Sequence, residues 1–368
     1  MTTLNSLFND YGQSPWIDNI RRDWLNDGTL ARLVEQGVRG VTSNPAIFAK
    51  AFATSSAYDQ FLNGMKGKDV EELFEELAVV DVRDACDVLK GVHEASFSDF
   101  QDTKYRYCDG FVSLEVSPRL ARDTAGTIAA ALKLNKAVGR SNVMIKIPAT
   151  NEGLPAITEV LGAGINVNVT LIFSVERYSE VLNAWMDGLE LAKKNGHELS
   201  SIGSVASFFV SRVDAAIDAL LPEGDARRGT TANAQVAAAY ALYLERINGS
   251  RAKALIADGA QVQRPLWAST ATKNPTYYDL LYVDSIAANE TVNTMPDPTL
   301  EGVLDHGNFS SSLLQNAASI VKAASLLYEL PSDISLSAVT DKLEADGVQS
   351  FIDSYADLLK TVADKVNG

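Results

Sequence analysis

The stretch Asn142-Val-Met-Ile-Lys146-Ile-Pro-Ala149 places one lysine among apolar and β-branched neighbours. A run of this composition predicts a buried strand. Burial disfavours the protonated form of a lysine, and an uncharged amine can attack a carbonyl group to form a Schiff base. Alternatively, the end of the side chain reaches solvent at the strand terminus or pairs with a carboxylate. The peptide alone leaves both interpretations open.

On either side of this stretch, short apolar runs alternate with longer runs of helical spacing. The predicted strands span residues 15–20, 37–43, 110–116, 142–148, 166–173, 202–210, 265–269 and 291–294. The predicted helices span residues 23–35, 70–92, 119–135, 175–195, 210–221, 232–257 and 279–288. Eight strands that alternate with helices predict an α/β fold, a closed (β/α)8 TIM-type barrel. We expect one barrel domain over residues 1–368, with a helical insertion around 49–106 and additional C-terminal helices around 317–367.

A doubly wound open sheet is the competing architecture. Its phosphate-binding fingerprint, Gly-x-Gly-x-x-Gly after the first strand, is missing from the sequence. The segment Gly162-Ala-Gly164 precedes a predicted strand and does not open a helix, so we interpret it as a turn. The closed barrel is therefore the favoured fold.

The composition limits the functions that this chain of 368 residues can have. Its 46% hydrophobic and 21% charged residues are ordinary for a globular protein. A formal net charge of −15 argues against a nucleic-acid or anionic-membrane partner, but not against a small anionic substrate. No apolar stretch reaches the length of a membrane span, and the N-terminus does not have the pattern of a signal peptide. These observations predict a cytoplasmic protein.

Cysteine and histidine usage predicts neither a disulfide framework nor a metal centre. Cys86 and Cys108 are the two cysteines of the chain. The three histidines, His93, His197 and His306, lie far apart and show no metal-binding spacing. We therefore expect an activity without a cofactor or a metal ion.

Polar side chains stand at the ends of the predicted strands, where a barrel of this type places its catalytic groups. The set comprises Asp18, Asn44, Glu115, Lys146, Asn168, Thr170, Ser207, Phe209, Arg212 and Lys273. Each member has a structural explanation of its own, such as a helix cap, a buried ion pair or a solvated surface. A structural account must also explain equivalent positions on seven strands, so the set as a whole favours an active site.

The residue types of this set suit Schiff-base chemistry. Carbinolamine formation and breakdown need an acid/base, often acting through a water molecule that Glu115 and Thr170 can hold. Cleavage of the neighbouring C–C bond needs a base for a hydroxyl proton, a task for Asp18. Amides and hydroxyls can orient a polyol, and cationic groups can bind a terminal phosphate. The first kind are Asn44, Asn168 and Ser207, and the second are Arg212 and Lys273.

Four segments resemble those of the class I transaldolases: Thr42-Ser-Asn-Pro45, Val143-Met-Ile-Lys-Ile-Pro148, Asn166-Val-Asn-Val-Thr-Leu-Ile-Phe173 and Phe209-Val-Ser-Arg212. The likeness covers nearly the whole chain. The insertion and the segment Trp267-Ala-Ser-Thr-Ala-Thr-Lys-Asn-Pro275 are similar to a longer actinobacterial or cyanobacterial form. The resemblance implies a (β/α) barrel that transfers a dihydroxyacetone unit between sugar phosphates in the pentose phosphate pathway.

The resemblance also implies a role for each member of the set. The donor would be sedoheptulose 7-phosphate or fructose 6-phosphate, and the acceptor glyceraldehyde 3-phosphate or erythrose 4-phosphate. Lys146 would form the Schiff base, Asp18 would act in C–C cleavage, and Glu115 with Thr170 would place a water molecule. The hydroxyls of the dihydroxyacetone unit would be held by Asn44, Asn168 and Ser207, and the phosphate by Arg212. Lys273 stands in a region where relatives often carry a second arginine, and the chain would act as a monomer or a homodimer.

The related fructose 6-phosphate aldolases, which release free dihydroxyacetone, are the alternative within the family. That branch is shorter and tends to carry tyrosine at the position of Phe209 and glutamine at that of Glu115. The enamine intermediate of a transferase must survive until the acceptor arrives, so its protonation by water has to be slow. A phenyl ring at position 209 lacks the hydroxyl that could help to deliver this proton. Phe209 and Glu115 therefore favour a transferase.

Overall fold

Seven parallel strands form a sheet whose two edge strands meet at Val41. The computed structural model describes residues 2–63 and 65–367. The sheet has the order β1-β7-β6-β5-β4-β3-β2, made of β1 (Gln13–Ile17), β2 (Val112–Glu115), β3 (Val143–Pro148), β4 (Val167–Ile172), β5 (Ser204–Phe209), β6 (Arg264–Ala268) and β7 (Thr291–Met295). Val41 bridges Ile17 of β1 on one side and Val112 of β2 on the other. This residue closes the ring, and the predicted (β/α)8 barrel is confirmed.

The strand predicted at residues 37–43 is shorter and less regular than expected: bridges form only at Val41, although Arg39, Gly40 and Thr42 also make backbone hydrogen bonds of 2.8–3.0 Å with β1. The segment begins just after Gly37, whose φ of 119° ends the preceding helix. It ends at Asn44, which caps the next helix. Gly40 packs so closely on Trp16 that a Cβ atom would lie 2.3 Å from the indole ring. The short extended segment therefore fills the eighth position of the barrel without forming a regular strand.

Helices surround the strands, and additional helices lie between Val41 and β2 and after β7. They are α1 (Thr3–Tyr11), α2 (Arg22–Asn26), α3 (Thr29–Gln36), α4 (Pro45–Thr54), α5 (Asp59–Leu62), α6 (Val70–Gln101), α7 (Thr124–Val138), α8 (Gly153–Gly162), α9 (Val175–Lys194), α10 (Ser211–Asp218), α11 (Thr231–Ile247), α12 (Ser250–Ala257), α13 (Leu281–Asp284), α14 (Asp297–His306), α15 (Ala317–Ser325) and α16 (Leu336–Asn367). The predicted helix 23–35 is two helices, α2 and α3, because Gly28 between them has a φ of 77°. The predicted helix 232–257 is likewise divided, at Asn248 and Gly249.

Extra helices lie at the places that the sequence predicted. The segment between Val41 and β2 holds α4, α5 and the 32-residue helix α6. The C-terminal segment holds α15 and the 32-residue helix α16. We propose that both segments belong to one barrel domain, because α16 packs on α4, α6, α10 and β4. None of the helices in the described part of the chain combines the length and apolar composition that crossing a bilayer requires.

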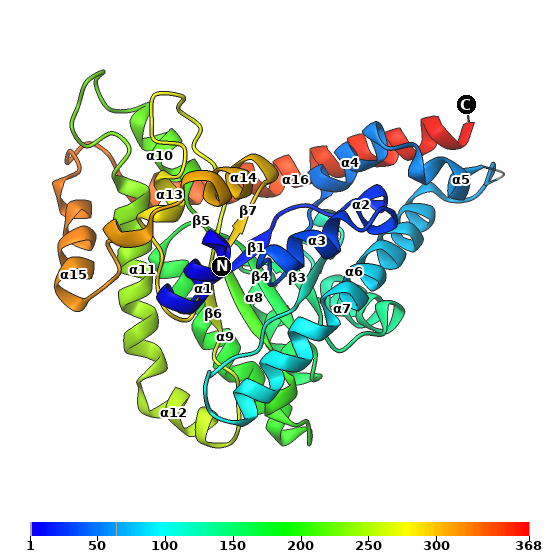
Figure 1. The fold of residues 1–368 in the computed structure, drawn as a ribbon, viewed down its shortest axis with the longest axis horizontal. Coiled ribbons are helices and arrows are strands. Elements are labelled where there is room, and N and C mark those ends of the chain that lie inside the picture. The colour runs from blue at the N-terminus through cyan, green and yellow to red at the C-terminus, as the bar shows by residue number, and fades with distance from the viewer. Residues whose placement is uncertain (1, 64, 368) are drawn as a thin grey trace.

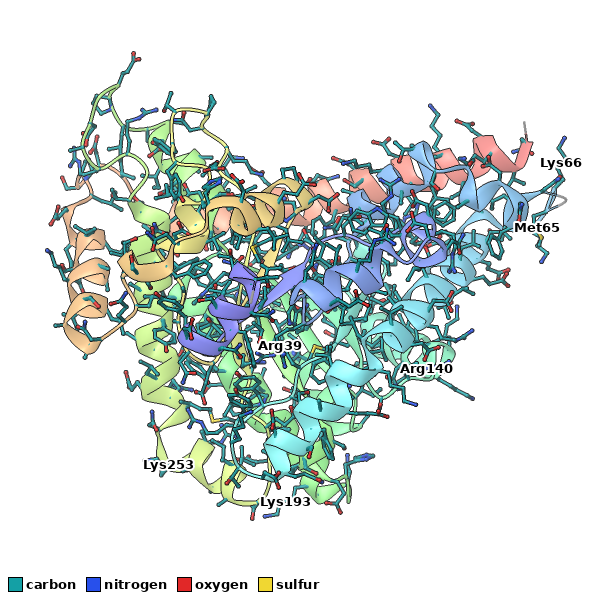
Figure 2. All side chains as sticks on the ribbon, in the orientation of Figure 1. Arg39, Met65, Lys66, Arg140, Lys193 and Lys253 are labelled. Carbon is teal, nitrogen blue, oxygen red and sulfur yellow. The ribbon has the colours of Figure 1, made fainter. Side chains whose placement is uncertain are left out.

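A buried ion network closes the N-terminal end of the barrel. Asp109 is fully buried, accepts a hydrogen bond of 2.8 Å from Trp16 Nε1 and pairs with Arg39 and Arg264. Burial alone would raise the pKa of Asp109, but the two guanidinium groups hold it below its usual value. Arg39 reaches this network from the segment before Val41 and is labelled in Figure 2. The interior is therefore accessible from the other end, where the strands terminate.

Helix α16 lies across that C-terminal end. Figure 1 shows α16 in red along the side toward which β7 points, next to α4. Tyr355 Oη donates a hydrogen bond of 2.9 Å to Glu71 of α6, and Lys365 Nζ donates one of 2.6 Å to Asp59. The exposed Lys193 and Lys253 lie at the opposite end of the molecule (Figure 2). The two ends of the barrel thus differ, and a helix covers the end that carries the predicted site.

Candidate active site

A cavity of about 200 Å³ opens where the strands end. Its lining comes from the ends of five strands or the loops after them, from the segment after Val41 and from α16. The lining residues are Asp18, Thr42, Asn44, Lys146, Ser207, Phe209, Arg212, Ala268, Ser269, Ala271, Lys273, Thr294, Pro296 and Phe351. Seven of the ten predicted site residues are among them. The other three, Glu115, Asn168 and Thr170, lie on neighbouring strands behind this lining.

The amine of Lys146 is enclosed. Strand β3 is buried along its whole length, as predicted, and the Lys146 side chain is 6% exposed. Its Nζ donates a hydrogen bond of 3.1 Å to the backbone carbonyl of Ser43 and lies 3.6 Å from Oε2 of Glu115. The ring of Phe351 lies 5.8 Å from the same nitrogen. The alternative in which the amine reaches bulk solvent at a strand end is wrong, since the side chain turns into the barrel.

Glu115 ends β2, opposite Lys146 in the strand register. Burial raises the pKa of this carboxyl to about 7, with the charge of Lys146 opposing the shift and that of Asp18 adding to it. Neither Oε2 of Glu115 nor Oγ1 of Thr170 on β4 has a hydrogen-bond partner within the described ranges, although both atoms are buried. Buried polar atoms without a hydrogen-bond partner are uncommon in folded proteins, and those that occur often belong to functional sites. A carboxyl that titrates near neutral pH can give or take a proton beside the amine.

Asp18 follows β1 and lines the same cavity as Lys146. The hydroxyl of Thr42 donates a hydrogen bond of 2.6 Å to Oδ1 of Asp18, and the hydroxyl oxygens of Thr42 and Thr294 lie 2.6 Å apart. Burial raises the pKa of Asp18, whereas the charge of Lys146 and the bond from Thr42 act against this shift. The Thr42 hydroxyl therefore fixes the orientation of the carboxylate and stabilises its charged form.

A chain of amide and hydroxyl groups runs behind the cavity wall. The Ser207 hydroxyl donates to Oδ1 of Asn168 at 2.7 Å, and Nδ2 of Asn168 donates to Oγ of Ser113 at 2.9 Å. Asn168 is fully buried and pairs with Lys146 in the sheet register. Asn44 lines the cavity and also caps α4, where its Oδ1 accepts a hydrogen bond of 3.0 Å from the backbone N–H of Ile47. A helix cap and a residue of the candidate site, the two interpretations of Asn44 from the sequence, are thus compatible.

Two cationic side chains lie together at the other end of the cavity. Arg212 is the second residue of α10, and its guanidinium carbon lies 5.3 Å from the ring of Phe209. Burial lowers the pKa of Arg212, while burial and the charge of Arg212 lower that of Lys273. Within residues 2–63 and 65–367, neither forms an ion pair with a carboxylate. Two neighbouring cations without a counter-charge, in a chain of net charge −15, are groups that can bind an anion.

Seven further lining residues were not predicted, and four of them, Thr42, Ser269, Thr294 and Phe351, have polar or aromatic side chains. Thr42 and Thr294 stand at strand ends, so the strand pattern could have identified them, but the pattern does not show which of them contacts Asp18. Ser269 has a left-handed φ of 56°, and its hydroxyl lies 3.1 Å from that of Ser211. Phe351 comes from α16, and nothing in the sequence places that helix over the barrel. In the described part of the chain, no group of three or more histidine, cysteine or acidic side chains is arranged for a metal ion.

An enclosed lysine amine beside a carboxyl of raised pKa, at the C-terminal end of a (β/α)8 barrel, defines an enzyme for carbonyl chemistry. The family model described as transaldolase/fructose-6-phosphate aldolase matches residues 15–362. A transaldolase of Saccharopolyspora erythraea is 46% identical over 376 residues, covering 100% of this chain and 99% of the other. Those of Mycolicibacterium smegmatis and Trichodesmium erythraeum are 47% and 41% identical and cover 95% and 96% of this chain and 93% and 95% of their own. The chain belongs to the transaldolase/fructose-6-phosphate aldolase family.

Within that family the chain is a transaldolase, a transferase, as its resemblance to the longer bacterial forms implied. The full-length relatives carry this name, and they include actinobacterial and cyanobacterial proteins. The alternative of an aldolase that releases free dihydroxyacetone is not favoured. The roles of the individual residues remain predictions that rest on the geometry described above.

Proposed function

We propose that the protein transfers a dihydroxyacetone unit from a ketose phosphate to an aldose phosphate through a Schiff base on Lys146. One observation carries the proposal: the enclosed amine of Lys146, the carboxyl of Asp18 and the cations Arg212 and Lys273 line one cavity. A carbonyl placed at the amine would extend its polyol chain along the cavity. Its phosphate would then lie at the cationic end.

Schiff-base formation begins when Nζ of Lys146 attacks the ketose carbonyl carbon. The carbinolamine then loses its hydroxyl group as water, for which it needs a proton. Glu115 can supply this proton, because its pKa of about 7 keeps both the acid and the carboxylate present at neutral pH. We propose that a water molecule held between Glu115 and Thr170 carries the proton, which would use the two buried oxygens that lack partners.

Cleavage follows once the iminium ion has formed. Asp18 takes the proton of the hydroxyl group beside the breaking bond, the C–C bond breaks, and its electron pair moves into the iminium to give an enamine. The aldose phosphate leaves, the acceptor aldehyde takes its place, and the same steps run in reverse. Thr42 assists by donating its hydrogen bond to the Asp18 carboxylate.

Substrate orientation falls to the polar lining. We propose that Ser207 and Asn44 contact the hydroxyls of the dihydroxyacetone unit directly, whereas the buried Asn168 acts by orienting the Ser207 hydroxyl. Arg212 and Lys273 would hold the phosphate, with Lys273 in the role of a second cation. Phe209 lies beside Arg212 and gives the cavity an apolar wall.

Sedoheptulose 7-phosphate and fructose 6-phosphate are the proposed donors, and glyceraldehyde 3-phosphate and erythrose 4-phosphate the proposed acceptors. These substrates place the enzyme in the pentose phosphate pathway. A cytoplasmic location and a monomeric or homodimeric state stay predictions from the sequence and the resemblance.

Borohydride trapping tests the proposal. Reduction in the presence of fructose 6-phosphate should fix a three-carbon adduct on the peptide that contains Lys146, detected by mass spectrometry. The variant Lys146→Arg keeps a cation but cannot form the Schiff base, so it is the matched control. A peptide that stays unmodified in the parent protein would refute the mechanism. Withholding the acceptor separates the two branches of the family, because a transferase then releases little free dihydroxyacetone.

A further inference from the structure

Phe351 brings the C-terminal helix into the cavity. It lines the same space as Asp18 and Lys146, although more than 200 residues separate it from β3 in the chain. The ring is 6% exposed and lies 5.8 Å from Nζ of Lys146. It is therefore placed to cover whatever is bound covalently to that nitrogen.

The barrel is shaped to receive this helix. The pairing of β4 with β5 is irregular between Val169 and Ile172, and Leu171 within this irregularity has a left-handed φ of 59°. A left-handed conformation is costly for a residue with a branched side chain, so it persists only where the surroundings require it. The result is that Leu171 and Phe173 pack with Phe351 in one apolar cluster.

Gly347, one helical turn before Phe351, allows the close approach. A Cβ atom at this position would lie 3.2 Å from Leu171 and 3.4 Å from Phe173. One turn after Phe351, Tyr355 donates its hydrogen bond to Glu71. Nearer the start of α16, Glu344 pairs with Arg177 at 3.4 Å. The helix is thus fixed on both sides of Phe351, which argues for a defined position of the ring.

A second aromatic wall faces the same space. Phe209 lines the cavity from β5, and Phe173 lies behind it with the two ring centroids 5.0 Å apart. Phe351 belongs to the same apolar cluster as these two residues but comes from a separate element. An intermediate on Lys146 would lie in a cavity with polar groups at the strand ends and an apolar wall of which α16 supplies one part.

We propose that Phe351 shields the enamine on Lys146 from water, and that α16 thereby sets how the dihydroxyacetone unit is divided between transfer and release. This inference rests on the proposed function. The transaldolase reaction leaves the enamine waiting for an acceptor, and slow protonation is what distinguishes transfer from release. The fold supplies the cover from its C-terminal helix, outside the strand ends where the reacting groups lie.

Release of free dihydroxyacetone from the enamine, which competes with transfer, proceeds in two steps. The nucleophilic carbon of the enamine takes a proton from water, which gives the iminium of dihydroxyacetone and a hydroxide ion. A water molecule then adds to the iminium carbon and gives up a proton to that hydroxide ion. The hydroxyl proton of the resulting carbinolamine moves to nitrogen as the C–N bond breaks, and the products are free dihydroxyacetone and the Lys146 amine. Both steps consume water at the covered nitrogen or at the carbon beside it. Removal of the cover should therefore favour release.

The test compares Phe351→Ala, which opens the cover, with Phe351→Leu, which keeps a large apolar side chain at this position. The measured quantity is the rate of free dihydroxyacetone release from fructose 6-phosphate without acceptor, divided by the rate of transfer to erythrose 4-phosphate. We expect this ratio to rise about tenfold or more in Phe351→Ala, and to stay within about twofold of the parent in Phe351→Leu. In heavy water the released dihydroxyacetone should carry deuterium on carbon, because the enamine takes its proton from solvent.

Borohydride trapping on the same samples distinguishes a failure of the role proposed for Phe351 from a failure of the Schiff-base mechanism. If the parent protein forms an adduct on Lys146 but the ratio in Phe351→Ala equals that of the parent, this inference is overturned and the proposed function stands. If the parent forms no adduct, the proposed function itself fails. Should Phe351→Ala not fold, Tyr355→Phe serves instead, because it loses the bond to Glu71 without changing a residue of the cavity. A raised ratio in that variant supports the inference, and an unchanged ratio overturns it.

Discussion

Replacement of Thr42 by valine should slow C–C cleavage and leave Schiff-base formation intact. Thr42 has a single hydroxyl proton and donates it to Oδ1 of Asp18 at 2.6 Å. The hydroxyl of Thr294, 2.6 Å away, must then donate to Thr42. Valine has nearly the same shape as threonine but lacks the hydroxyl group. The change therefore removes the hydrogen bond to the carboxylate and the one that Thr294 donates to Thr42, and the second loss is what the control variant at Thr294 measures.

The size of the effect follows from the kind of bond. A hydrogen bond to a charged group contributes about 1.5–3 kcal/mol. At about 1.36 kcal/mol for each factor of ten, kcat should fall by about 10-fold to 150-fold. The Thr42 bond lowers the pKa of Asp18, so its loss should raise that pKa further. Less of Asp18 is then ionised at a given pH, and the acidic limb of the kcat profile should move to higher pH.

The assay measures kcat for transfer from fructose 6-phosphate to erythrose 4-phosphate as a function of pH. Borohydride trapping on Lys146 should remain as in the parent, because that step uses Glu115. Thr294→Val is the matched control: it keeps the bond from Thr42 to Asp18 and should lower kcat by less than about tenfold. A Thr42→Val enzyme with the kcat and the acidic limb of the parent would refute the assignment of Asp18 as the base.

Three further changes test other parts of the structure. Arg212→Gln should raise KM for phosphorylated donors by about 10-fold to 100-fold with little effect on unphosphorylated dihydroxyacetone as donor, as steady-state kinetics would show. The pKa of Glu115 is 4.5 when unperturbed and about 7 in the folded protein, so between these values the folded state holds a proton that the unfolded state has lost, and the stability of the parent falls as pH rises. The free energy of unfolding of Glu115→Gln, measured in urea, should therefore rise relative to that of the parent by up to about 3 kcal/mol over this range. A difference that does not depend on pH would contradict the assignment. Asp109→Asn leaves the guanidinium of the buried Arg264 without its carboxylate and should cost about 3–5 kcal/mol, seen as a lower urea midpoint with KM unchanged.

The strand ends of the barrel could be predicted from the sequence because two simple rules apply to them. Apolar runs bounded by turns locate buried strands, and a parallel barrel brings the ends of those strands together. Lys146, Asp18 and Ser207 reach one cavity for this reason. The alternation along β4 also placed Asn168 and Thr170 on the same side of the sheet.

Other features depend on long-range packing, and a local pattern does not carry that information. The pattern does not show that Ser207 donates a hydrogen bond to Asn168, since this depends on how far each strand is shifted along its neighbour. It does not show that Phe351 covers Lys146, because the position of α16 depends on contacts with Leu171 and the α4 and α6 helices. The division between α2 and α3 is a different case. The turn signal at residues 26–28 was present, but the helical periodicity on either side of it predicted one continuous helix.

The interrupted eighth position of the barrel has a consequence for engineering. Because the chain makes strand-like bridges only at Val41, the backbone carbonyl of Ser43 is free to accept the proton of the Lys146 amine. A main-chain oxygen remains when the side chains around it are exchanged. The cavity walls could therefore be redesigned for other carbonyl compounds, through Ser207 or Phe209 for example, while the nucleophile keeps its resting position.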